Sequence, residues 1–121
     1  MDENKPRKLE EDTALYLHQI EEQFNILNSN HGKENNEDNL EKKQIILENV
    51  ILELSSRNRT ASALCDRRSN YLMEKICLQC DLNILLSIID TCSSYSLFLA
   101  RNRYSSHVIQ AIMARFALDS L

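Results

Sequence analysis

The chain has 121 residues, of which 43% are hydrophobic, so it is long and apolar enough for one small domain, which argues against wholesale disorder. One Gly and one Pro leave almost no material for tight β-turns, which excludes a hairpin-rich β protein and favours helices. The formal net charge of −4 is unevenly divided, because residues 1–56 carry 13 acidic and 6 basic side chains whereas residues 57–121 carry 5 acidic and 8 basic ones.

The N-terminal third predicts a tail and one helix. Asp12 or Thr13 can cap a helix that ends near Asn28. Its apolar residues recur at steps of three and four, namely Leu17, Ile20, Phe24 and Leu27. We therefore expect residues 1–29 to form an N-terminal tail and helix.

Residues 30–39 are polar throughout and predict a flexible linker. A second helix is expected from about Leu40 to Leu54, and Ser55 to Arg59 should end it. The N-terminus lacks a hydrophobic signal segment, and we find no run of about 18 apolar residues. We therefore expect an intracellular protein without a membrane partner.

Beyond Thr60 the sequence repeats itself without a gap. The stretch that begins at Ala63 aligns with the stretch that begins at Leu99, and Ser69, Glu74 and Ile76 each have an equivalent 36 residues later. A fixed period of 20–50 residues is typical of helical-repeat solenoids. An apolar helix between the copies completes each unit, so we expect a packing helix and a more exposed helix in each repeat.

A helical wheel separates two faces on the second helix of each copy. The polar arc consists of Asn70, Tyr71 and Glu74 in the first copy and of Ser106, His107 and Gln110 in the second. The packing arc consists of Leu72, Met73, Ile76, Cys77 and Cys80 in the first copy and of Val108, Ile109, Ile112, Met113 and Phe116 in the second. We expect the polar arc to face outward and the packing arc to be buried.

Two polar side chains four residues apart, with a flat ring beside the first, suit a nucleobase, because they can contact its edge while the ring stacks on its face. For one helix alone, a solvated polar face explains the same residues. Repetition at the same phase favours the base-binding interpretation.

The two segments resemble the RNA-binding helix of pumilio repeats, an all-α family whose right-handed solenoids bind about one base per repeat. The resemblance implies that Asn70 with Glu74, and Ser106 with Gln110, contact base edges. It also implies that Tyr71 and His107 stack on bases. In that family a Ser and Gln pair goes with adenine, whereas the Asn and Glu pair leaves its base undecided.

A closer resemblance is to the nucleolar protein nine family, pumilio-like proteins of small-subunit ribosomal RNA maturation. It rests on the segments 12–22, Glu48-Asn49-Val50 and Arg103-Tyr104-Ser105-Ser106-His107-Val108. The resemblance implies a nucleolar, monomeric factor without a cofactor, whose partners are pre-ribosomal RNA and other assembly factors. Family members carry many more repeats than the two expected in residues 40–121, so we expect a fragment or a truncated gene product.

Arginines cluster before both repeated helices. Arg67 and Arg68 precede the first, and Arg101 and Arg103 precede the second. Arg grips phosphate with two donors, so these side chains are candidate phosphate ligands. A solvated basic rim is the alternative.

Other chemistry finds little support in the sequence. Cys77 and Cys80 have metal-ligand spacing and are flanked by Cys65 and Cys92, but their equivalents one period later are Met113 and Phe116, so we expect thiols and no metal. No catalytic motif is present, so we do not expect an enzyme.

Two other interpretations stay open: a cytoplasmic pumilio-type regulator of messenger RNA, and an armadillo- or HEAT-like scaffold that binds proteins.

Overall fold

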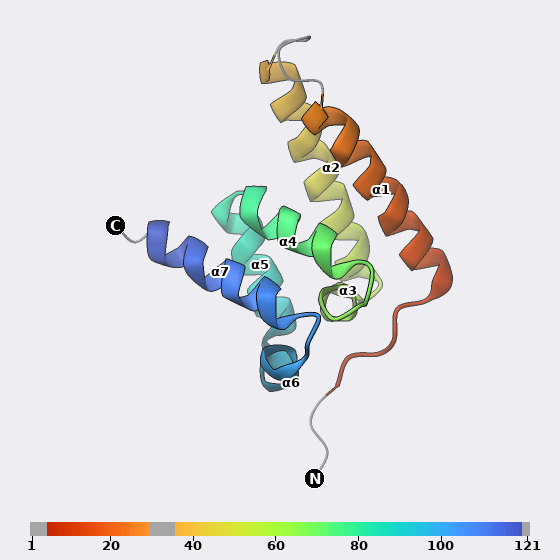
Figure 1. The fold of residues 1–121 in the computed structure, drawn as a ribbon, viewed down its shortest axis with the longest axis vertical. Coiled ribbons are helices and arrows are strands. Elements are labelled where there is room, and N and C mark those ends of the chain that lie inside the picture. Colours follow the sequence, from red (N-terminus) through yellow and green to blue (C-terminus); the bar gives the residue numbers. More distant parts are fainter. Residues whose placement is uncertain (1–4, 30–35, 120–121) are drawn as a thin grey trace.

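The computed structural model describes residues 5–29 and 36–119, and within them the chain is all-helical (Figure 1). The elements are α1 (Glu11–Ser29), α2 (Asn36–Ser56), α3 (Thr60–Leu64), α4 (Asn70–Gln79), α5 (Leu82–Cys92), the 3-10 helix η1 (Ser93–Tyr95), α6 (Ser96–Arg101) and α7 (Ser106–Asp119). No strand occurs in the described residues, and the expected all-α class is confirmed.

Successive helix boundaries repeat with the period found in the sequence. Three pairs are each 36 residues apart: the ends of α2 and α5 at Ser56 and Cys92, the starts of α3 and α6 at Thr60 and Ser96, and the starts of α4 and α7 at Asn70 and Ser106. Each unit thus has three helices, whereas the sequence predicts two. The additional helices, α3 and α6, have five and six residues and are too short to show a helical period in the sequence.

The turns before α4 and α7 are built alike by equivalent polar residues. Oδ2 of Asp66 accepts hydrogen bonds from the backbone N–H groups of Arg68 (3.1 Å) and Ser69 (2.9 Å). Oδ1 of Asn102 accepts from those of Tyr104 (2.8 Å) and Ser105 (3.2 Å). Such side-chain turns orient the chain for the next helix. The same device therefore starts both helices of the polar arc.

The N-terminal helices differ from expectation at one boundary. The first helix, α1, runs from Glu11 to Ser29, close to the expected range, but α2 begins at Asn36, four residues before the expected start. Residues 30–35 of the expected linker lie outside the described residues. The helix α2 ends at Ser56, within the expected range of Ser55 to Arg59. Asn58, two residues later, adopts a φ of 57°, a left-handed conformation that terminates helices.

The hydrophobic core is built from the buried faces of all the α-helices in the described residues. The fully buried large side chains come from every α-helix in the described residues and include Phe24, Leu47, Leu64, Leu72, Leu85, Leu99 and Val108. The whole packing arc of the first copy is buried, which confirms that part of the wheel. On α7, Val108 and Ile112 are buried as expected, and Ile109 and Phe116 are half-buried.

Met113 departs from the expectation, because 65% of it is exposed. Its equivalent 36 residues earlier, Cys77, is 0% exposed. The two positions have the same phase on their helices, but α7 covers α4 whereas no described element covers the corresponding face of α7 (Figure 1). The helical wheel places Met113 on the packing side of α7, in line with its equivalent Cys77 on α4. The prediction that Met113 is buried is wrong.

The segment Leu82–Arg101 is long and apolar enough to cross a membrane by length and composition, with a mean hydropathy of 1.4. This finding differs from the expectation that no such run exists. Its three elements, α5, η1 and α6, contribute Leu85, Ile88 and Leu99 to the core. Because the core helices of globular proteins pass the same test, this is weak evidence for a membrane span.

Candidate nucleic-acid interface

The helices α4 and α7 lie side by side, run in the same direction and bring the two polar arcs together (Figure 1). At the far end of the pair, Nη1 of Arg115 donates to the backbone carbonyl of Cys77 (2.9 Å). Near the start, His107 reaches across to Asn70. One residue from each end of α7 therefore anchors it to α4.

His107 is the centre of the polar arc. Its Nε2 lies 2.5 Å from Oδ1 of Asn70, and its Nδ1 lies 3.2 Å from Oε2 of Glu74. Its ring also meets that of Tyr71, with centroids 5.6 Å apart and planes tilted by 34°. The two copies of the arc are thus directly coupled through one imidazole.

The orientation of the Asn70 amide fixes the hydrogen on His107. The amide Nδ2 of Asn70 donates to the carbonyl oxygens of Asp66 (2.8 Å) and Arg67 (2.9 Å), so its Oδ1 must face the ring as an acceptor. Nε2 of His107 must then carry a hydrogen. Nδ1 of the same ring faces the carboxylate of Glu74.

These contacts correct the expectation that Asn70 faces outward. Asn70 is 1% exposed, and both ends of its amide are used within the protein. The wheel places it at the margin of the packing arc, where the turn before α4 and His107 of the next unit close over it. Asn70 therefore supports the site and is not available to a base edge.

The remaining arc residues are accessible to different degrees. Tyr71 is 60% exposed and Gln110 is exposed, whereas Glu74, Ser106 and His107 are half-buried. A flat exposed ring, a carboxylate and an amide on one surface can stack on an aromatic ligand and exchange hydrogen bonds with its edge. The structure brings these side chains together on neighbouring turns of two helices.

The four candidate phosphate ligands lie in or next to the turns that precede α4 and α7. Arg67 and Arg68 lie in the first turn, whereas Arg101 ends α6 and Arg103 follows it. The guanidinium of Arg103 lies 5.2 Å from the ring centroid of Tyr104, a cation–π distance. The described surface therefore has positive charge at the start of both arc helices.

The cysteines lie inside the core or at its margin. Burial raises the pKa of the Cys77 thiol well above its usual range and raises that of Cys92 to about 12. All four are free, and the described residues contain no group of three or more His, Cys, Asp or Glu side chains that could hold a metal ion. Both Cys77 and Cys80 are buried near α7, and Sγ of Cys80 accepts a hydrogen bond from Nη1 of Arg115 (3.6 Å).

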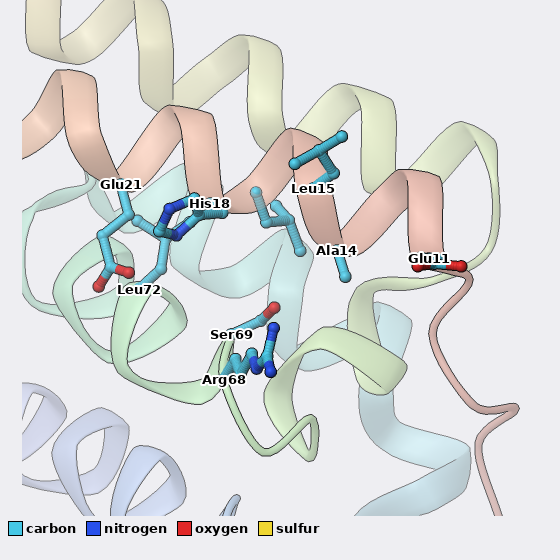
Figure 2. Close-up of a pocket in the computed structure, with 9 residues that line it drawn as sticks. Glu11, Ala14, Leu15, His18, Glu21, Arg68, Ser69 and Leu72 are labelled. Atoms are coloured by element: carbon cyan, nitrogen blue, oxygen red, sulfur yellow. The ribbon is translucent and has the colours of Figure 1, made fainter.

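Sequence reasoning missed two features of this surface. The first is Arg115, whose role depends on a contact 38 residues away. The second is a groove of about 450 Å³ between α1 and α4, lined by Glu11, Ala14, Leu15, Leu17, His18, Glu21, Arg68, Ser69 and Leu72 (Figure 2). No repeat signal links α1 to α4, so only the packing of α1 could have indicated this groove.

Comparisons of the chain with protein-family models, with curated proteins and with solved structures found no match. Any function assigned to the chain therefore rests on the geometry of the surface and on the resemblance carried by its motifs.

Proposed function

We propose that this chain is a single-stranded-RNA-binding module, a right-handed pumilio-like solenoid of about two repeats. The observation that supports it best is the pairing of α4 and α7 in a 36-residue register, each preceded by the same type of turn and each carrying a ring and polar side chains on one surface. A chance polar face gives no reason for such a repeat of position and chemistry.

The surface suggests a division of roles. Tyr71 stacks on one base, and Glu74 accepts hydrogen bonds from its edge. Ser106 and Gln110 contact the next base, and His107 lies between the two positions. Asn70 has no direct role, because its amide is committed to the turn and to His107. The arginines before each helix bind the phosphates.

The biological setting follows from the resemblance to the nucleolar protein nine family. On that basis we propose a non-enzymatic, monomeric nucleolar factor that acts on small-subunit pre-ribosomal RNA, without a cofactor. A cytoplasmic regulator of messenger RNA uses the same surface chemistry. Binding competition between pre-ribosomal and messenger RNA fragments distinguishes these two targets.

The test measures the affinity of the full chain for a fluorescent pool of random single-stranded RNA octanucleotides by anisotropy. Affinity should fall between about 50 and 200 mM salt, because bound phosphates release counterions. Replacing Arg67, Arg68, Arg101 and Arg103 by Ala should flatten the salt slope by about 0.7 for each phosphate that is no longer bound. Arg57→Ala is the matched control, since its guanidinium already pairs with Glu53 at 2.7 Å.

An unchanged slope in the quadruple variant would exclude these arginines from the interface, and no measurable binding by the parent chain would refute the proposal. The Tyr71→Ala variant adds a test of stacking, since removal of one base–aromatic stack weakens binding by roughly five-fold or more. Leu86→Ala, a change at an exposed position on α5, should bind like the parent.

An apolar groove favours a second candidate function, a scaffold that binds protein helices. It has a volume of about 440 Å³, is formed by residues of α3 and α5 to α7, and includes Leu64, Ile89, Ile109, Met113 and Phe116. A partner seated there would bind with little dependence on salt, because the contact is apolar. The salt titration therefore separates the two functions.

A further inference from the structure

The helix α1 packs along α2 (Figure 1) and shares a groove with α4 (Figure 2). The residues that face each other across this groove advance together along both helices. Glu11 lies at one end of the shared groove and Glu21 with Leu72 at the other, and Arg68 lies between them (Figure 2). One turn further, Nζ of Lys75 donates to Asn25 (3.2 Å) and also contacts Glu21. The two helices therefore follow the same chain direction on the two sides of the groove.

The burial pattern of α1 matches that of α4 at a constant displacement. Three pairs of buried positions are each 56 residues apart: Thr13 and Ser69, Leu17 and Met73, and Phe24 and Cys80. The two helices therefore present the same face to the core. By this register, Ala14, Leu15 and His18 on α1 take the places that Asn70, Tyr71 and Glu74 take on α4.

The accessibility of these α1 residues agrees with the register. Leu15 is 58% exposed and His18 is exposed, as Tyr71 is on α4. Both line the groove, whose other wall carries the guanidinium of Arg68 beside Ser69 (Figure 2). Between α4 and α7 the equivalent space is closed by His107, whereas between α1 and α4 it is open. The groove volume of about 450 Å³ lies within the range of small-ligand sites.

We propose that the groove between α1 and α4 binds a third nucleotide of the same RNA strand, an inference that rests on the proposed function. The apolar side chain of Leu15 packs against the base, His18 contacts its edge, and Arg68 binds the adjoining phosphate. Ala14, which lacks the amide of Asn70, leaves room for the base.

The charges in the groove determine where each part of the nucleotide lies. Glu21 is engaged by Lys75 (3.3 Å), so part of its charge is already compensated. Glu11 lies at the opposite end, away from Glu21 (Figure 2). The phosphate therefore lies on the Arg68 wall, and the exocyclic amino group of a base can donate to a carboxylate.

The experiment follows the backbone amide signals of the full isotope-labelled chain by NMR while random single-stranded RNA octanucleotides are added. We expect signals of residues 14–21 on α1 to shift together with those near Tyr71 and Gln110. The double variant Leu15→Ala with His18→Ala should bind the octanucleotides roughly three- to ten-fold more weakly, at the lower end of the effect of removing one stacked base. Gln23→Ala, an exposed position on α1 beside a different groove, should bind like the parent.

The outcomes separate this inference from the proposed function. Shifts on α4 and α7 with none on α1, and a double variant that binds like the parent, overturn the third nucleotide site and leave the proposed function standing. An absence of shifts on all three helices overturns both. Circular dichroism of the double variant, which should match the parent because both side chains are exposed, excludes misfolding as the cause of weaker binding.

Discussion

The two sides of the α4 and α7 pair differ. On the side of α4, α1 packs on α2 and shares a groove with α4, and the tail that precedes α1 is held by the ion pair of Arg59 with Glu10, whose closest atoms are 2.6 Å apart. On the other side no helix of the described residues lies beyond α7, and Met113 is exposed. The same sequence period therefore produces a covered packing arc on α4 and a partly open one on α7.

This difference separates what a periodic pattern specifies from what it does not. The spacing of apolar residues specifies which side of a helix can pack, since it depends only on helix geometry. Burial also requires a neighbouring element, and the pattern of one helix carries no information about that neighbour. Four sets of variants test this comparison, and they follow in order of decreasing expected effect.

Met73 and Met113 offer the largest contrast with the same residue type. Met73 is 0% exposed, so Met73→Ala should lower the free energy of unfolding by about 2–5 kcal/mol, because apolar packing is removed and a cavity remains. Met113→Ala should change it by less than about 0.5 kcal/mol, because the side chain is mostly exposed. Urea unfolding of both variants measures this. Equal losses of stability would mean that the face of α7 is covered in solution.

The sequence predicted the helical class, the 36-residue register and the buried side of α4, because these depend on local periodicity. It did not predict α3 and α6, which are too short to show a period. It placed Asn70 outward, because the wheel cannot include His107, which approaches from 37 residues away. The groove between α1 and α4 also went unpredicted, since the sequences of these two helices do not repeat each other.

A substitution of His107 tests whether its contacts couple the stability of the two copies of the polar arc. In His107→Ala, the buried Oδ1 of Asn70 loses its partner, and an unsatisfied buried acceptor costs about 1–3 kcal/mol in unfolding free energy. Glu74→Gln is the control, because it keeps an acceptor oxygen near Nδ1 and should cost less. If chemical denaturation finds the two variants equally stable, water replaces the imidazole at Asn70 and the coupling is weak.

Arg115 tests the other end of the contact between α4 and α7. Replacing it by Ala removes the hydrogen bond to the carbonyl of Cys77 and should lower the free energy of unfolding by about 1 kcal/mol. The equivalent residue on α4, Gln79, is exposed, and Gln79→Ala should change stability by no more than about 0.5 kcal/mol. Thermal unfolding of the pair gives the comparison. A loss of stability confined to Gln79→Ala would contradict the anchoring role of Arg115.

The smallest effect concerns the tail that precedes α1 and appears only in acid. Hydrogen bonding to Arg59 lowers the pKa of Glu10 from 4.5 to about 2. A carboxyl group whose pKa is lower in the folded protein than in the unfolded chain stabilises the fold above the unfolded pKa. That stabilisation should be complete above pH 4.5 and should be lost as the pH falls toward about 2.

Glu10→Gln removes the titrating group, so the difference in unfolding free energy between parent and variant should shrink as the pH is lowered through this window. The pair lies at the surface, so the difference should also decrease with added salt. Glu11→Gln, one residue along, keeps the pair of Glu10 with Arg59 and should retain the acid dependence of the parent. A difference between parent and Glu10→Gln that stays constant from neutral pH to pH 2 would show that Arg59 does not hold the tail in solution, because the pair would then contribute nothing that protonation can remove.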